Sequence, residues 1–461
     1  MRGKKFSIGL KAVAIFAVTL LVTSTWAATN WHEKVLHSFN GTDGWSPEAG
    51  LIFDAAGNLY GTTEYGGTGG NCGAYGCGTV FELTPNGSGG WTETVLYNFC
   101  SQTGCADGAN PAAGLIFDAA GNLYGTTYGG GTYNYYCSGG CGTVFKLTPQ
   151  AGGGWTETVL HSFGNVLGDG FLPDAGLIFD VAGNLYGTTY AGGAYGQGAV
   201  FELTPTGGGG WTVNVLFSFN YTDGFGPSAA LIFDAAGNLY GTTILGGNYG
   251  AGTVFELTPN PSGGWTETVL HSFNRNGTDG WYPEAGLILY AAGNLYGTTY
   301  WGGTQWCGGS GCGTVFELTV RYGGWAYTVL HSFSGGDGAG PSAGLILDAA
   351  GNLYGTTSAG GVNGVGTVLE LTPIAGGGWT EQVLHNFGNG TDGVNPWSGL
   401  IFDAAGNLYG TTYWGGNYGD GTVFELTPIY PCAKCSHGVD REVHGFPAEK
   451  RDVLERRKPI E

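Results

Sequence analysis

Short apolar segments separated by turn residues recur along most of the chain. In the first unit they are residues 51–54, 58–63, 79–84 and 91–99. Each segment is rich in β-branched or aromatic residues and is bounded by Gly, Asn or Pro, which is typical of strands. The connection 54–58 reads Asp-Ala-Ala-Gly-Asn, which predicts a type I turn followed by a left-handed Gly and capped by the Asp. One unit is therefore predicted to be a four-stranded antiparallel meander.

This unit repeats seven times. The string Gly-Asn-Leu-Tyr-Gly-Thr-Thr begins at Gly57, Gly121, Gly183, Gly237, Gly293, Gly351 and Gly406. Seven four-stranded sheets arranged radially make an all-β, seven-bladed β-propeller. A β-solenoid is the alternative, but its coils are usually much shorter than these units and it needs capping ends, which we do not find.

The two ends of the repeat array predict how the ring closes. Residues 35–39 resemble a fourth strand and precede the first complete unit, whereas residues 422–427 resemble a third strand with no fourth strand after them. An unpaired strand edge at this point is something that natural β proteins avoid. We therefore expect residues 35–39 to complete the seventh blade by pairing antiparallel to residues 422–427.

The units read GLIFDAAGNLYGTT…GTVFELTP, preceded by VLHSF…TDG and a Pro. They resemble the GloVer tandem repeat of exported bacterial "choice-of-anchor" proteins over residues 31–429, and more loosely the blades of NHL-type propellers. The resemblance implies an exported repeat protein and no catalytic residues. It also implies a surface-anchoring segment at the C-terminus. Residues 430–461 depart from that pattern, because they are charged and contain no apolar anchor.

The N-terminus has the features of a secretory signal peptide. A basic start is followed by eleven apolar residues, 12–22, and by small residues at 25 and 27 that suit cleavage after Ala27. An uncleaved signal-anchor is the alternative. The chain thus divides into a signal peptide (1–27), a propeller (28–429) and a charged tail expected to be disordered (430–461). We expect a secreted, cell-surface or periplasmic bacterial protein, monomeric and not inserted in the membrane after signal cleavage.

Charge narrows the range of partners. The chain has 94 Gly residues and is only 11% charged, and residues 28–429 contain 4 basic and 29 acidic residues, a net charge of −25. Such a body repels phosphate backbones, so nucleic acid is excluded as a partner. Cations, neutral sugars and basic partners remain compatible with it.

Cysteine pairs coincide with long loops on one predicted face, the face opposite the Asp-Ala-Ala-Gly-Asn turns. In an exported protein, pairs inside one loop are typical of local disulfides rather than half-sites for zinc, since no second pair or His accompanies each pair in the sequence. The predicted disulfides are Cys72–Cys77, Cys100–Cys105, Cys137–Cys141 and Cys307–Cys312. Because insertions concentrate on this face, we expect it to carry binding.

The motif Asp-Gly-x-x-Pro occurs in every unit and leads into the innermost strand. Its acidic residues are Asp43, Asp107, Asp169, Asp223, Asp279, Asp337 and Asp392. They are interpreted first as turn-forming residues that cap their own loop. The functional alternative is a ring of carboxylates at the channel mouth that binds a hard cation, with Ca²⁺ as the candidate cofactor.

Two aromatic sets complete the candidates. The motif Val-Leu-His-Ser-Phe carries His37, His161, His271 and His331, with a related copy at His385; Tyr97 and Phe217 replace the His elsewhere, which favours packing over ligation. Aromatic residues near the predicted binding face are candidates for stacking on sugar rings, with blade-to-blade packing as the alternative. They are Trp45, Phe171, Phe225, Trp281, Trp301, Trp306 and Trp414.

Two classes of function follow. The first is a non-enzymatic extracellular or cell-surface binding scaffold that contacts a polysaccharide or a surface protein. The second is a secreted carbohydrate-active enzyme that uses carboxylates of the loop-rich face. An acid pair across the central pocket with one desolvated member favours the enzyme. A shallow, evenly repeated face favours binding.

Overall fold

The fold was analysed in a computed structural model that describes residues 30–69, 72–132, 137, 139–165, 168–290, 292–305 and 307–430. Residues Trp31–Thr427 form one compact unit. The predicted signal peptide and nearly all of the predicted tail lie outside the described residues. No helix in the described ranges is long and apolar enough to cross a membrane.

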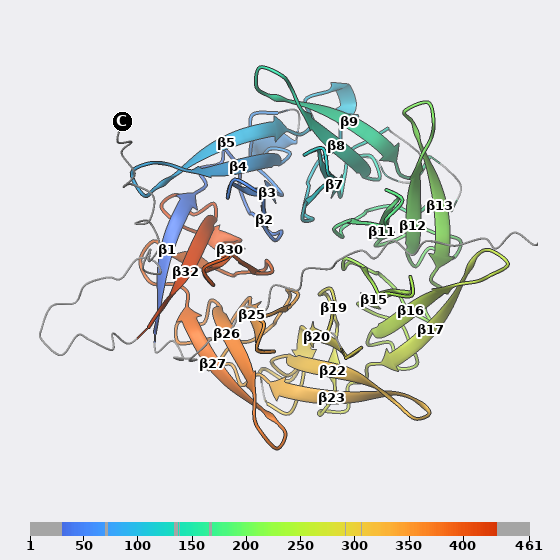
Figure 1. The fold of residues 1–461 in the computed structure, drawn as a ribbon, viewed down its shortest axis with the longest axis vertical. Coiled ribbons are helices and arrows are strands. Elements are labelled where there is room, and N and C mark those ends of the chain that lie inside the picture. Colours follow the sequence, from blue (N-terminus) through green and yellow to red (C-terminus); the bar gives the residue numbers. More distant parts are fainter. Residues whose placement is uncertain are drawn as a thin grey trace, which may run out of the picture. The chain divides into compact units, whose positions relative to one another are not determined.

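The compact unit is a seven-bladed propeller of four-stranded antiparallel sheets, as predicted, and Figure 1 shows the blades following one another around the ring. Blade 1 contains β2 (Ile52–Phe53), β3 (Leu59–Thr63), β4 (Thr79–Pro85) and β5 (Trp91–Asn98). Blade 2 contains β6 (Ile116–Phe117), β7 (Leu123–Thr127), β8 (Thr143–Pro149) and β9 (Trp155–Ser162). Blade 3 contains β10 (Ile178–Phe179), β11 (Leu185–Thr189), β12 (Ala199–Pro205) and β13 (Trp211–Ser218).

The remaining blades repeat this order. Blade 4 contains β14 (Ile232–Phe233), β15 (Leu239–Thr243), β16 (Thr253–Pro259) and β17 (Trp265–Ser272). Blade 5 contains β19 (Ile288–Leu289), β20 (Leu295–Thr299), β22 (Thr314–Arg321) and β23 (Gly324–Ser332). Blade 6 contains β24 (Ile346–Leu347), β25 (Leu353–Thr357), β26 (Thr367–Pro373) and β27 (Trp379–Asn386). Blade 7 contains β29 (Ile401–Phe402), β30 (Leu408–Thr412), β32 (Thr422–Ile429) and β1 (Asn30–Ser38).

Four short strands and two turns of 3₁₀ helix lie in the loops. The strands are β18 (Gly280–Trp281), which pairs with β21 (Trp301–Gly302), and β28 (Gly393–Val394), which pairs with β31 (Trp414–Gly415). The helical turns are η1 (Gly73–Tyr75) and η2 (Thr103–Cys105). We call the face that carries these loops the top face, and the face with the Asp-x-x-Gly-Asn turns the bottom face.

The predicted ring closure is confirmed. The N-terminal strand β1 is the outer strand of blade 7 and pairs with β32, and Figure 1 shows the two ends of the colour scale side by side there. Immediately after β1, the Phe39 N–H donates to the Gly421 carbonyl at 3.0 Å, as Phe99 N–H does to Gly78 within blade 1. Blade 7 therefore has the same hydrogen bond after its outer strand as a blade built from one continuous segment. We call the interface of blade 7 with blade 1 the seam.

Hydrophobic clusters between neighbouring blades form the core. In blade 1, Tyr60, Val80 and Phe99 pack against Leu123 and Phe145 of blade 2, and all five are at most 5% exposed. Equivalent clusters fill the other six interfaces, including the seam. Because each blade buries both faces against its neighbours, the ring is stable only as a whole.

Polar contacts repeat at each interface as well. The second-strand Thr62 hydroxyl donates to the Ala113 carbonyl of the next blade at 3.1 Å, and a Thr donates in the same way at every interface up to Thr411, which reaches Pro47 and Ala49. On the top face, the residue before the Pro of each Asp-Gly-x-x-Pro motif has a φ near +60°. Its N–H donates to a carbonyl of the preceding blade; the N–H of Leu172, for example, donates to the Cys141 carbonyl at 2.8 Å. A left-handed Leu is strained, so these contacts must hold the loop in place.

The bottom turn forms as predicted. Asp54 Oδ1 accepts the N–H of Asn58 at 2.9 Å, while Gly57 has a φ of +87°. The Tyr60 hydroxyl lies between Asp54 Oδ2 and Glu82 Oε1, at 3.2 and 2.7 Å. This arrangement ties the turn to the third strand, so the bottom face is uniform in most blades.

Candidate functional site

The top face carries a two-stranded contact over every blade. The residue after each Asp-Gly pairs with the residue that lies two positions beyond the second strand. The pairs are Trp45↔Tyr65, Ala109↔Gly129, Phe171↔Ala191, Phe225↔Leu245, Trp281↔Trp301, Ala339↔Ala359 and Val394↔Trp414. All the aromatic candidates except Trp306, which lies outside the described residues, thus occupy one repeated structural position.

Blade 5 has a cavity beside its aromatic pair. The cavity of about 270 Å³ is lined by Arg275, Asp279, Trp281, Gln305 and Ser310, together with Thr304 and several Gly residues. Its lining includes residues 309–311, which lie between Cys307 and Cys312. A predicted disulfide loop therefore forms a wall of a top-face cavity.

The cavity combines aromatic and polar surfaces. The Trp281 and Trp301 rings are stacked with centroids 6.0 Å apart, and the Arg275 guanidinium lies 4.3 Å from the centre of the Trp281 ring. The Asp279 carboxylate accepts a hydrogen bond from His271 through Oδ2, while its buried Oδ1 has no hydrogen-bond partner among the described residues. Aromatic and hydrogen-bonding side chains that line one cavity favour a ligand with both apolar and polar faces.

The other aromatic candidates do not line this cavity. Trp45 and Trp414 meet across the seam at 5.4 Å and, with Tyr65 and Tyr75, form an aromatic cluster in which Tyr75 is 60% exposed. Phe171 packs partly into the cluster between blades 2 and 3. Trp281 packs in the same way against the cluster between blades 4 and 5, so packing, the alternative weighed for these rings, applies to both residues, and Trp281 lines the cavity as well.

The predicted Asp residues lie beside the outer strands. Asp43 Oδ1 accepts the N–H of Asn40 at 2.9 Å, which is the turn-forming role expected of it. Five of these Asp residues also contact the His of the preceding outer strand, at 3.0–3.2 Å. Where Tyr97 replaces His, its hydroxyl donates to Asp107 at 2.8 Å. Six of the seven Asp residues thus contact their own outer strand, whereas Asp223, which follows Phe217, contacts its own loop through the Asn220 N–H.

The His residues pack as predicted, but they are not only packing residues. His37 meets Phe39 edge-on at 4.7 Å and is half-buried, while its Nε2 lies 3.2 Å from Asp43 Oδ2. The sequence analysis treated the His and Asp motifs separately and missed this contact. Their constant order, with the Asp six to eight positions after the His, was the available signal.

A set of glutamates on the outer strands was also missed. They occupy the third position of the Trp-Thr-Glu-Thr-like strand in five blades: Glu33, Glu93, Glu157, Glu267 and Glu381. Burial raises the pKa of Glu93 to about 7, and the charges of His37 and Asp43 act on it across the seam. Each such Glu therefore faces the Asp of the preceding interface.

Four carboxylates meet at the propeller axis on the top face. Burial raises the pKa of Glu48 well above its usual value, and the charges of Glu64, Asp174 and Glu284 raise it further. Burial and a neighbouring carboxylate raise the pKa of Asp174 to about 6 and that of Glu284 to about 7. These residues come from the loops that enter blades 1, 3 and 5, so only the axis brings them together.

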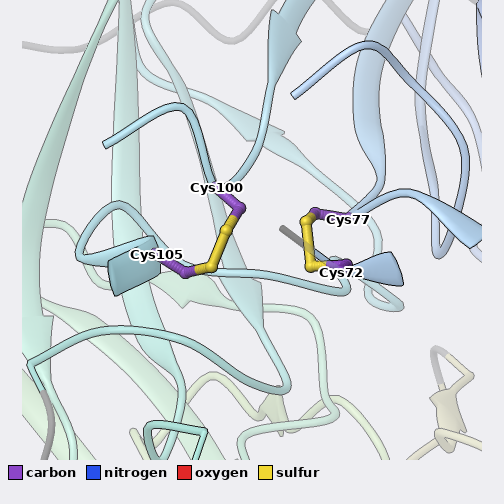
Figure 2. A group of neighbouring side chains, drawn as sticks. All are labelled: Cys72, Cys77, Cys100 and Cys105. Atoms are coloured by element: carbon purple, nitrogen blue, oxygen red, sulfur yellow. A yellow bond between two sulfur atoms is a disulfide. The ribbon is translucent and has the colours of Figure 1, made fainter. Parts of the chain in front are cut away.

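The eight cysteines in the described part of the chain are joined in the four local pairs predicted. Figure 2 shows that two of the pairs, Cys72–Cys77 and Cys100–Cys105, lie side by side, and their four sulfur atoms are within 4.8 Å of one another. The argument used against a zinc site was that no second cysteine pair accompanies each pair in the sequence. In three dimensions a second pair does lie beside the first, because β5 returns the chain to the same loop. With both disulfides formed, no thiolate is available in this cluster to bind metal.

A family model described as the Gloeobacter/Verrucomicrobia repeat matches the chain in three overlapping regions, residues 19–178, 71–310 and 302–445. The comparison with curated proteins gives no match. The seven blades described above account for the repeated regions.

Proposed function

Because the chain belongs to the Gloeobacter/Verrucomicrobia repeat family, we propose that it is an exported, monomeric binding scaffold whose top face binds a carbohydrate. The observation that carries this proposal is the blade 5 cavity, which is lined by Trp281, Arg275 and Asp279. An aromatic face with nearby hydrogen-bonding groups suits a sugar ring, which is apolar on its faces and polar at its edge.

The cavity is small and open to the top face, so it suits one or two residues of a longer polysaccharide rather than an enclosed ligand. Blade 5 is the blade in which both of the paired positions hold Trp. A single recognition point on a rigid ring is consistent with a scaffold. A surface protein that presents such a glycan is compatible with the same site.

A glycan array with the mature chain tests the proposal. We expect Trp281→Ala to weaken binding about tenfold or more, as loss of a central aromatic anchor does. Phe171→Ala is the matched control, since Phe171 has the same position in blade 3 and does not line the blade 5 cavity. Equal loss in both variants, or no glycan bound by the wild type, would contradict a carbohydrate site in blade 5.

The axial carboxylates favour a second candidate, a carbohydrate-active enzyme. Asp174 and Glu284 lie on loops of non-adjacent blades, and burial together with the charge of Asp174 raises the pKa of Glu284 to about 7, as expected of the acid member of a pair. Glu284→Gln then abolishes hydrolysis of a bound glycan while Trp281-dependent binding persists. A wild-type chain that binds glycans without releasing reducing ends leaves the scaffold as the function.

A further inference from the structure

Each blade interface brings three repeat positions together: the His position of one outer strand, the Asp of the following loop, and the Glu position of the next outer strand. All three residue types are present at three interfaces. These sets are His37, Asp43 and Glu93; His331, Asp337 and Glu381; and His385, Asp392 and Glu33. At the other four interfaces Tyr97 or Phe217 replaces the His, or Val213 or Tyr327 replaces the Glu.

The set at the seam is the most tightly gathered. One ligand-type atom from each of His37, Asp43 and Glu93 lies within 4.8 Å of the others. His37 Nε2 lies 3.2 Å from Asp43 Oδ2, and these two side chains are 19% and 14% exposed. The imidazole comes from β1, the first carboxylate from the following loop, and the second carboxylate from β5 of blade 1.

A second observation concerns Glu93 itself. Its Oε1 atom is buried and has no hydrogen-bond partner among the described residues, and the same is true of the other four Glu residues at this repeat position, Glu33, Glu157, Glu267 and Glu381. A buried carboxylate oxygen with no donor is costly, so such groups usually have a partner or a cation. Among the described residues, His37 is the one basic side chain whose charge acts on Glu93, and its imidazole already contacts Asp43.

We propose that His37, Asp43 and Glu93 bind one divalent cation of the zinc class across the seam. An imidazole nitrogen with two carboxylate oxygens is a ligand set that Zn²⁺ accepts, whereas Ca²⁺ takes six to eight oxygen ligands. The cation satisfies the orphaned Glu93 oxygen and replaces the proton shared by His37 and Asp43. This site differs from the calcium ring considered from the sequence, because each Asp acts with a His and a Glu and not with other Asp residues.

The position of the site gives the cation a structural role, which is to join the N-terminal strand β1 to blade 1. β1 is held in blade 7 without a covalent link to β32, and the cation joins its His37 to β5 of blade 1. β1 also supplies Glu33 to the set at the interface of blades 6 and 7. A ligand that binds only the closed ring stabilises it by mass action. The inference does not rest on carbohydrate binding, and each can fail without the other.

Titration of the tag-free, non-reduced full chain with Zn²⁺ tests the site by calorimetry and thermal unfolding. We expect saturable binding that raises the melting temperature, and His37→Gln and Glu93→Gln each to weaken the affinity by more than about tenfold, the scale on which even an outer-shell partner matters. His161→Gln is the matched control, because His161 contacts Asp169 in the same way but faces Val213 in place of Glu. It should leave Zn²⁺ binding unchanged.

Histidine footprinting provides a readout that does not depend on the variants folding. Zn²⁺ should protect His37 of the wild type from acylation by diethyl pyrocarbonate, and should leave His161 as reactive as before. Absence of Zn²⁺ binding, binding that both variants retain, or unprotected His37 would overturn the proposal. Stabilisation by Ca²⁺ equal to that by Zn²⁺ would overturn the assignment to the zinc class.

Discussion

The seam between blades 7 and 1 is formed in part by β1, which has no direct covalent link to β32 of its own blade, whereas blade 2 is one continuous segment; yet the core at the seam and the core between blades 2 and 3 are alike. At the seam Phe39 meets Phe81 edge-on at 5.0 Å, and in the continuous interface Phe163 meets Phe201 at 5.1 Å. Both sites are fully buried. The comparison teaches that packing and hydrogen bonds suffice to close the ring where the chain itself does not.

The two interfaces diverge at the rim and on the top face. Glu93 at the seam corresponds to Val213, and the Trp45–Tyr65 pair corresponds to Phe171 and Ala191. Substitution at these positions does not disturb the shared core. The variable positions are therefore the ones free to carry binding, and the following experiments separate them from the core.

The largest effect on stability is expected from removing a buried Phe ring from the core at the seam or from the core between blades 2 and 3. Phe39→Ala and Phe163→Ala should each lower the free energy of unfolding by about 3–5 kcal/mol, since each leaves a cavity among buried residues. Chemical denaturation measures both. A much smaller cost for Phe39→Ala would show that the seam is looser than the continuous interface.

A smaller effect is expected from the hydroxyl that joins neighbouring blades near the axis. Thr411 donates to Pro47 or Ala49 at the seam, and Thr126 donates to Ala175 at 3.1 Å. Changing either Thr to Val leaves a buried carbonyl unpaired and should cost about 1–3 kcal/mol. Equal losses in denaturation midpoint would support equivalence of the two interfaces, and a loss confined to Thr126→Val would break it.

The buried carboxylates at the axis predict that the stability of the protein depends on pH, through Glu48 at the seam and through Asp174 between blades 2 and 3. The pKa of Asp174 is raised to about 6 by burial and the charge of Glu64, above about 4 in the unfolded chain. Between these values the folded state binds more protons, so rising pH removes stability until about pH 6. Asp174→Asn should therefore be more stable than wild type at pH 8, on the order of 1 kcal/mol because solvent screens the axis, and similar at pH 3.5.

Glu48→Gln is the seam counterpart. The pKa of Glu48 is raised further by burial and its acidic neighbours, so its gain in stability should appear at higher pH than that of Asp174→Asn. Denaturation midpoints over a pH series compare the two. A wild-type chain whose stability is independent of pH between 4 and 8 would argue against the axial cluster.

The smallest effect on stability comes from rebuilding the seam set elsewhere. Val213→Glu places a carboxylate opposite His161 and Asp169, and half-buried Val213 can be replaced at a cost of about 1 kcal/mol. Zn²⁺ stoichiometry should rise by one per chain relative to wild type. Val213→Gln is the control. An unchanged Zn²⁺ stoichiometry in both variants would show that the set of His, Asp and Glu is not what binds the metal.

Much of the propeller was predictable because each repeat is a local unit. The bottom turn needs only Asp54, Gly57 and their neighbours, whose hydrogen bonds lie within five residues of one another. The strand order followed from the short turns. The second-strand and third-strand bounds differ from the prediction by one residue, whereas the innermost strand is shortened to Ile52–Phe53. It has least room because all seven blades converge at the axis.

The candidate sites were predictable only in part. The repeat position after the Pro holds Glu48, Asp174 and Glu284 in three blades, but Ala, Ser or Trp in the others. With no repeated signal, these carboxylates looked like isolated surface residues. Similarly, Arg275 lies outside every motif, and it reaches Trp281 only because the loop after β17 folds back over blade 5.

The sequence by itself determined the unit, the number of blades, the bottom turns, the local cysteine pairs and the strand that closes the ring. All of these depend on patterns within one repeat or on the offset between the two ends. Tertiary structure alone decided which side chains meet: Glu93 with His37 and Asp43 across the seam, the carboxylates at the axis, and the two cysteine pairs beside each other. These contacts join different blades, and their geometry is set by how seven sheets pack around one axis.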